Sequence, residues 1–237
     1  MWPDLSRRNH QVELMDAPGL DPGSHRRALR GLDRINWFSR SADIVWKPIH
    51  SLIATAPKRT WRVLDVASGG GGVALALARL AKSTQLNIDV RGVDVSATAT
   101  EHAEENARST GFSNVTFQQL DVLRNPLPDD YDVVMCSLFL HHLTSDEAIS
   151  LLRSMAHAAR RLVLVNDLRR TRLGYALAWW GGRMLSRSPI VHADGPMSVA
   201  AAFKAEEALD MAEEAGLKGA AIVPRWPQRF LLSWSRP

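Results

Sequence analysis

The sequence has little cysteine and no long apolar segment. Cys136 is its only cysteine, and it lies within the apolar run DVVMCSLFL, which excludes an internal disulfide and a cysteine-rich metal site. No apolar run reaches the roughly 18 residues that a membrane-spanning helix needs. The start, MWPDLSRRNHQVELMD, lacks the apolar core of a secretory signal. We therefore expect a soluble, cytoplasmic protein without stable membrane insertion.

Charge of one sign is also scarce. The chain has 29 Lys and Arg residues against 25 Asp and Glu, and its basic residues form pairs such as Arg7-Arg8, not a long basic tract. This pattern argues against nucleic acid as a partner. A length of 237 residues, 46% of them hydrophobic, predicts one domain with elaborations.

From Trp61 onward, β-rich runs alternate with helical segments, which predicts a mostly parallel sheet with crossover helices. The segments AAIVPRW and RFLLSWS flank a Pro227-Gln228 turn and predict a closing hairpin with an antiparallel strand. Ser96 and Ser145 are the expected N-caps of two helices. The expected strands are residues 61–67, 87–95, 114–122, 130–140 and 161–168, and the expected helices are residues 71–83, 96–111, 145–160 and 201–217.

Two segments fall outside this alternation. Residues 24–56 have apolar side chains at helical spacing and predict two helices, which we expect at one edge of the sheet. The segment LGYALAWWGGRMLS is apolar on nearly all sides where no core strand is due. We therefore divide the chain into a helical lid, residues 1–56, and a main domain, residues 57–237, with a substrate-lid insertion at residues 169–200.

The stretch DVASGGGG places four glycines between the first strand and its helix. Glycines there let a ligand approach the backbone N–H groups at a helix N-terminus. Asp65 precedes this loop, Asp94 closes the second strand, and Asp121 closes the third. These carboxylates should line the carboxyl edge of the sheet, where open α/β sheets bind ligands. Asp94 suits the two ribose hydroxyls of an NAD or adenosyl cofactor, and Asp121 suits an adenine amino group.

The motifs VLDVASGGGG, GVDVS, LDV and DVVMCSLFLHHL follow one another within residues 61–235. As a set they resemble the class I S-adenosylmethionine-dependent methyltransferases. Many members have glycine at the position of Ala67. An alanine at this position is similar to the sequences of the quinone-biosynthesis methyltransferase group. The segment NDLRRTRLGY also looks like bacterial enzymes that methylate phenolic or polyketide products at oxygen.

The resemblance implies a Rossmann-like, seven-stranded sheet with helices on both faces and an antiparallel last strand. It implies S-adenosylmethionine as cofactor, S-adenosylhomocysteine as product and a role in secondary metabolism. The cofactor-binding residues that it implies are Asp65, Ala67, Ser68, Gly69, Gly71, Asp94, Val95, Asp121, Val122 and Ser137.

Candidate catalytic residues follow the fourth strand. A phenol has a pKa of about 10, so it needs a base or an electropositive site near neutral pH, where histidine titrates. His142 matches the histidine of the resembled family, and His141 is the second candidate. The alternative is that His142 only orders its loop.

Substrate-binding candidates are Asp167, Arg169 and Arg170 after the fifth strand, and His192 in VHADGPMS. No His, Cys, Asp and Glu set has metal-ligand spacing, so we expect no metal. The pair Trp179-Trp180 in the apolar segment favours an aromatic or partly apolar small-molecule acceptor. An exposed lid helix is compatible with a homodimer.

The predicted function is methyl transfer from S-adenosylmethionine to a small aromatic acceptor, at oxygen. Transfer to carbon or nitrogen, methylation of nucleic acid, and a non-catalytic binding module remain alternatives. So does an NAD(P)-dependent oxidoreductase, because residues 69–74 fit G-x-G-x-x-A. Neither Tyr131 nor Tyr175 has the lysine four residues later that short-chain reductases use.

Overall fold

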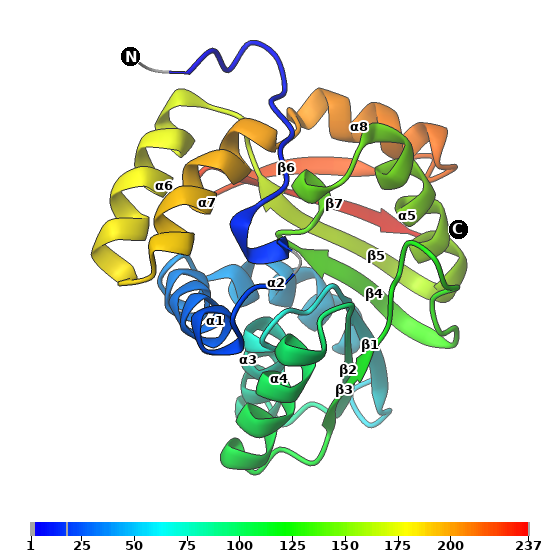
Figure 1. Cartoon of the computed structure of the whole chain (residues 1–237). Coiled ribbons are helices and arrows are strands. Elements are labelled where there is room, and N and C mark those ends of the chain that lie inside the picture. Colours follow the sequence, from blue (N-terminus) through cyan, green and yellow to red (C-terminus); the bar gives the residue numbers. More distant parts are fainter. Residues whose placement is uncertain (1–2, 18, 237) are drawn as a thin grey trace.

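The computed structural model describes residues 3–17 and 19–236. Met1, Trp2 and Pro18 of the predicted lid and Pro237 of the predicted main domain lie outside the described residues. Within the described part, seven strands form one sheet in the order β3-β2-β1-β4-β5-β7-β6 (Figure 1). The strands are β1 (Trp61–Val66), β2 (Ile88–Asp94), β3 (Val115–Gln119), β4 (Tyr131–Ser137), β5 (Ala159–Leu168), β6 (Ala221–Arg225) and β7 (Arg229–Ser235).

Strands β1 to β5 pair in parallel, and β7 pairs antiparallel with both β5 and β6. This confirms the predicted fold class and the closing hairpin. The helices are α1 (Pro22–Phe38), α2 (Ser41–Ile53), α3 (Gly72–Ser83), α4 (Ala97–Thr110), α5 (Ser145–Ala158), α6 (Arg172–Leu185), α7 (Pro189–Ala201) and α8 (Ala205–Glu214), with short 3₁₀ turns η1 (Leu14–Asp16) and η2 (Leu140–His142).

An apolar layer covers each face of the sheet. Helices α2, α3 and α4 contribute to one layer, and α5 and α8 contribute to the other. Val133 and Val134 of β4 join opposite layers because successive strand side chains point to opposite faces. The central strands are therefore buried on both sides, which explains why they read as continuous apolar runs.

The sequence predicted both N-terminal helices at one edge of the sheet, but helix α2 does not lie there. Its buried residues Ile49 and Ile53 pack in the same layer as Leu164 of β5 and Leu231 of β7. The helix therefore lies on a face of the sheet, because burying this apolar stripe needs a broad apolar surface that an edge strand cannot offer.

Two helix boundaries also differ from the prediction. Helix α5 is capped by Thr144, whose hydroxyl accepts from the Glu147 N–H while the Glu147 carboxylate accepts from the Thr144 N–H. Ser145 is therefore the first helical residue and not the cap. The expected helix 201–217 is shorter, since extended backbone at Ala202 and Lys204 separates α7 from α8.

The carboxyl ends of the parallel strands are covered by the two segments predicted as lids. Helix α1 contacts α3, α4, α6 and α7, and α6 packs along α7. The N-terminal segment crosses α7 toward the end of β4 (Figure 1). Asp94 is the last residue of β2, as predicted, whereas Asp121 lies beyond the end of β3. None of the helices in the described residues is both long and apolar enough to cross a membrane.

Candidate functional site

A cavity of about 990 Å³ lies at the carboxyl edge of the sheet. The loops after β1, β2, β3 and β4 line one side of it, and α1, α6 and α7 line the other. Ligands of open α/β sheets bind at this edge. The volume lies at the upper end of the range of small-molecule sites, so it has room for more than one small ligand.

The turn between β1 and α3 is packed on one side and open on the other. Gly69 and Gly71 both have positive φ, 53° and 78°. A Cβ on Gly71 would lie 2.4 Å from the Phe117 ring, whereas a Cβ on Gly69 would meet no described atom within 4 Å. The glycines therefore let the loop sit tightly on the sheet while its cavity side stays clear for a ligand at the start of α3.

Asp94 ties this loop to the end of β2. Its carboxylate accepts hydrogen bonds from the backbone N–H of Gly69 at 2.8 Å and of Ser96 at 2.9 Å. Each carboxylate oxygen has a second lone pair, so Asp94 can also accept from ligand hydroxyls. Asp121 lines the same cavity, accepts from the Leu123 N–H at 3.1 Å and lies 3.5 Å from Arg124.

Asp65 is buried beneath the glycine loop, with 1% of its surface exposed. Among the described residues, its Oδ2 has no hydrogen-bond partner. Burial, and secondly the charge of Asp94, raise the pKa of Asp65 to about 8. A positively charged ligand group would stabilise the ionised form of this buried side chain, whose Oδ2 lacks a hydrogen-bond partner among the described residues.

The predicted cofactor residues come together in the cavity lining, with the exception of Gly71, which packs against Phe117. Those that line the cavity are Asp65, Ala67, Ser68, Gly69, Asp94, Val95, Asp121, Val122 and Ser137. Their closeness follows from the parallel sheet, because each strand ends at the same edge.

His141 and His142 line the cavity from η2, directly after β4. The His141 Nδ1 lies 2.6 Å from Asp167 Oδ1, and Asp167 also accepts the His141 backbone N–H at 3.1 Å. Burial alone would raise the pKa of Asp167, but the charge and hydrogen bond of His141 lower it below its usual range overall. Asp167 thus fixes the orientation of the His141 ring.

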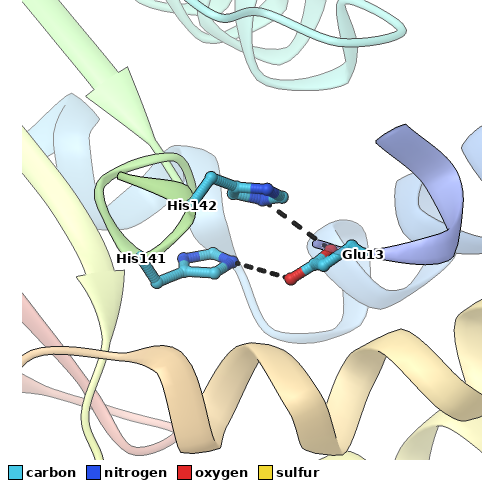
Figure 2. Close-up of side chains that lie close together, drawn as sticks. All are labelled: Glu13, His141 and His142. Atoms are coloured by element: carbon cyan, nitrogen blue, oxygen red, sulfur yellow. Dashed lines mark ion pairs between the residues drawn. The ribbon is translucent and has the colours of Figure 1, made fainter. Parts of the chain in front are cut away.

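The N-terminal segment brings Glu13 to these histidines (Figure 2). Glu13 Oε1 lies 3.6 Å from His141 Nε2, and Oε2 lies 3.8 Å from His142 Nε2. Glu13 is 6% exposed and accepts a hydrogen bond from Ser198 Oγ at 2.5 Å. Glu13 has no signal in the sequence, because only the folded chain places it beside residues so distant in sequence.

The four predicted substrate residues lie outside the cavity lining in the described structure. Arg170 is buried and forms an ion pair with Glu207 at 2.7 Å, so it joins β5 to α8. The His192 Nε2 lies 2.7 Å from the Ser186 carbonyl oxygen. Asp167 instead supports His141, and the Arg169 N–H donates to the Gln228 carbonyl.

Two other charged residues line the cavity and were not predicted. Asp33 of α1 lies against the glycine loop, since a Cβ on Gly72 would be 2.6 Å from its Oδ1. Arg229, at the start of β7, is buried and donates to Ser39 and Ser41. Burial lowers the pKa of Arg229 to about 10. No local motif marks either residue.

Residues 63–161 match the family model described as a methyltransferase domain. The chain is 31% identical over 124 residues to the ubiquinone/menaquinone biosynthesis C-methyltransferase of Proteus mirabilis, a match over 51% of this chain and 48% of that protein. It is 32% identical over 114 residues to ribosomal protein L11 methyltransferase of Deinococcus radiodurans, over 45% and 40% of the two chains. The chain thus spans less than half the length of these relatives.

Magnesium protoporphyrin IX methyltransferase from Synechocystis PCC 6803 has a similar fold, with a TM-score of 0.60 and 19% identity over 97% of this chain and 90% of that one. Residues 63–161 are thus a methyltransferase domain, and the strand order and the glycine loop agree with the resemblance to the class I S-adenosylmethionine-dependent methyltransferases that the motifs indicated.

Proposed function

We propose that this protein transfers the methyl group of S-adenosylmethionine to a hydroxyl oxygen of a small, partly apolar aromatic molecule. The observation that carries the proposal is the continuous cavity, which extends from the glycine loop to His141 and His142. One ligand can therefore lie at the loop while another lies beside the histidines, within reach of the first.

The loop end of the cavity fits S-adenosylmethionine. Asp65 has a buried oxygen without a partner among the described residues, and Asp65 and Gly69 both line the cavity. A ligand that carries a positive sulfonium and an ammonium group would compensate this carboxylate. In this proposal Asp94 accepts the ribose hydroxyls and Asp121 accepts from the adenine amino group.

The helical side of the cavity suits an apolar acceptor. The apolar residues that line the cavity from α1 and α6 include Leu29, Leu32, Leu177, Trp180 and Met184. Trp180 is 62% exposed and Met184 81% exposed, although both are large apolar side chains. Exposed apolar side chains at a cavity rim are typical of a ligand-binding surface. We infer that residues 169–200 and the part of residues 1–56 that precedes α2 act as the lid over the acceptor.

The chemistry needs alignment and the removal of one proton. The bound cofactor supplies an electrophilic methyl group on a positively charged sulfur. The acceptor oxygen forms its bond to this methyl carbon while the sulfur–carbon bond breaks and leaves its electron pair on sulfur. We assign His142 to take the hydroxyl proton and pass it to water, while Asp167 and His141 hold the turn in place.

Carbon is the second candidate for the methylated atom. The relative from Proteus mirabilis is named as a C-methyltransferase of quinone biosynthesis, and its match covers 51% of this chain and 48% of that protein. An activated phenol ring can accept a methyl group at carbon as well as at oxygen. The cofactor end would be the same for both reactions.

The test combines binding with product analysis. Isothermal titration with S-adenosylmethionine, S-adenosylhomocysteine and NADH should show binding of the two adenosyl ligands only. Phenols and quinols are then incubated with methyl-labelled cofactor, and NMR of the product distinguishes an O-methyl from a C-methyl group. Binding of NADH alone would contradict the proposal. Methylation of the ring alone would show that the methyl group is transferred to carbon and not to oxygen.

A further inference from the structure

The cluster of Glu13, His141 and His142 is built like a metal site. Their ligand atoms, one carboxylate oxygen and two imidazole nitrogens, all lie within 4.8 Å of one another. Figure 2 shows both rings directed at the Glu13 carboxylate. Glu13 and His141 are buried, and His142 is half-buried at the cavity wall.

The separations within the cluster exceed those of direct hydrogen bonds. Glu13 oxygens lie 3.6 Å and 3.8 Å from the two Nε2 atoms, whereas N–H···O bonds span about 2.7–3.2 Å. Around a tetrahedral metal with bonds of about 2.1 Å, neighbouring ligand atoms are about 3.4 Å apart. An ion can therefore enter between the three groups with little rearrangement of their side chains.

The surroundings of the cluster orient its ligands. His141 Nδ1 is held by Asp167 at 2.6 Å, which leaves Nε2 toward Glu13. The carboxylate–histidine pair is the outer support that metal-bound histidines commonly have. Ser198 donates to Glu13 Oε1 at 2.5 Å and so fixes the third ligand. Asp167 and Ser198 thus set the direction of His141 and Glu13.

The N-terminal segment is tied down on both sides of Glu13. Asp194 of α7 accepts the backbone N–H groups of Leu14 at 2.9 Å and of Met15 at 3.0 Å. Arg8 donates to the His141 carbonyl at 2.9 Å and to the Leu143 carbonyl. The N-terminal segment that carries Glu13 is therefore also hydrogen-bonded to the turn that carries the two histidines.

We propose that Glu13, His141 and His142 bind one divalent transition-metal ion at the acceptor end of the cavity. Two imidazoles and one carboxylate suit Zn²⁺, Fe²⁺ or Mn²⁺ better than Mg²⁺ or Ca²⁺, which prefer oxygen ligands alone. Three protein ligands leave at least one coordination position for a water molecule or an acceptor oxygen.

The use of this ion rests on the proposed function. A hydroxyl bound to the metal loses its proton to water more readily, because the metal stabilises the oxygen anion. His142 would then be a ligand, and the metal would take over its task of activating the acceptor. The metal site itself does not depend on methyl transfer, so the two can fail separately.

The test is a titration of chelator-treated, full-length protein. We expect calorimetry with Zn²⁺ to give one ion per chain, and Co²⁺ to give a visible absorption spectrum of a nitrogen- and oxygen-ligated site. Glu13→Gln and His142→Gln should each weaken binding at least about 10-fold. His157→Gln, at an exposed histidine near the end of α5, is the matched control and should bind like the wild type.

Asp167, which supports His141 without being a ligand itself, offers an independent test of the metal site. Asp167→Asn should weaken metal binding by about 10–100-fold, as loss of a histidine's supporting carboxylate does elsewhere. Circular dichroism melts show whether each variant is folded. The metal site would be overturned if the wild type formed no one-to-one complex with Zn²⁺. It would also be overturned if Glu13→Gln and His142→Gln bound Zn²⁺ with the affinity of the wild type.

Titration with S-adenosylmethionine separates the two proposals. Protein that binds the cofactor and methylates a phenol at full rate after chelation, without binding Zn²⁺, overturns the metal site and supports the proposed function. Protein that binds Zn²⁺ through these residues but binds no adenosyl ligand supports the metal site and overturns the function.

Discussion

Two buried aspartates, Asp65 in the cavity lining and Asp167 behind His141, have opposite pKa shifts. Asp65 and Asp167 are both 1% exposed. Burial and Asp94 raise the pKa of Asp65 to about 8, whereas His141 lowers the pKa of Asp167 despite its burial. Equal burial thus gives opposite shifts, because Asp167 has His141 as a partner whereas Asp65 Oδ2 has no hydrogen-bond partner among the described residues.

The difference shows what each end is built to do. Asp167 holds His141 and also accepts the Leu168 N–H at 2.6 Å, so the acceptor end is already organised by the chain itself. Asp65 retains an oxygen without a hydrogen-bond partner in the described part of the chain. A cationic ligand would supply the missing interaction, so the cofactor end should be completed by binding.

The largest expected effect concerns the acceptor end alone. His142→Gln should lower kcat by about 10²–10⁴-fold, because it removes the group that activates the acceptor, either as a base or as a metal ligand. The dissociation constant of S-adenosylmethionine should not change. Steady-state kinetics and calorimetry measure the two quantities, with His157→Gln as control. Less than a 10-fold fall in kcat would contradict the role of His142.

The next largest effect concerns the cofactor end alone. Asp94→Asn should weaken S-adenosylmethionine binding by about 10–100-fold, since charge-assisted hydrogen bonds contribute about 1.5–3 kcal/mol each. Asp121→Asn should have a smaller effect, because this carboxylate already interacts with Arg124. Calorimetry measures both, and Zn²⁺ binding should persist. An Asp94 variant with unchanged affinity would rule out its ribose contact.

A stability effect should mark the packed side of the glycine loop. Gly71→Ala places a Cβ at φ 78° and 2.4 Å from Phe117, so we expect a loss of about 2–4 kcal/mol in unfolding free energy. Gly111→Ala has a similar φ of 69° but meets no described atom within 4 Å, so about 1 kcal/mol is expected. Thermal melts compare them, and equal losses would show that contact with Phe117 is unimportant.

The last expected effect is the pH dependence of stability that follows from Asp65. Its folded pKa of about 8 lies above its ordinary value of 3.8, so the folded protein holds a proton that the unfolded chain has lost. The contribution of Asp65 to stability is therefore greatest at low pH and falls as pH rises from about 4 to about 8. Asp65→Asn removes this slope.

Thermal melts at pH 5 and pH 8 measure this effect. The Asp65→Asn variant should gain stability relative to the wild type as pH rises. A constant difference between variant and wild type would mean that Asp65 is ionised in the empty protein.

Much of the fold was readable from the sequence. The sheet, its closing hairpin and the N-cap Ser96 were predicted, because apolar runs, turn residues and caps act locally. The boundary near Ala201 was not, since alanine-rich sequence on both sides hides the break that tertiary packing imposes at Ala202. Thr144 was missed as a cap because it precedes an equally suitable Ser145.

The sequence by itself determined the cofactor end of the cavity. Asp65, Gly69, Asp94 and Asp121 follow successive strands, and parallel strands bring such residues to one edge whatever the rest of the chain does. Only the tertiary structure decided the acceptor end. Glu13 meets His141 and His142 because Arg8 and Asp194 fasten the N-terminal segment across α7, a set of contacts between residues far apart in sequence that leaves no local pattern.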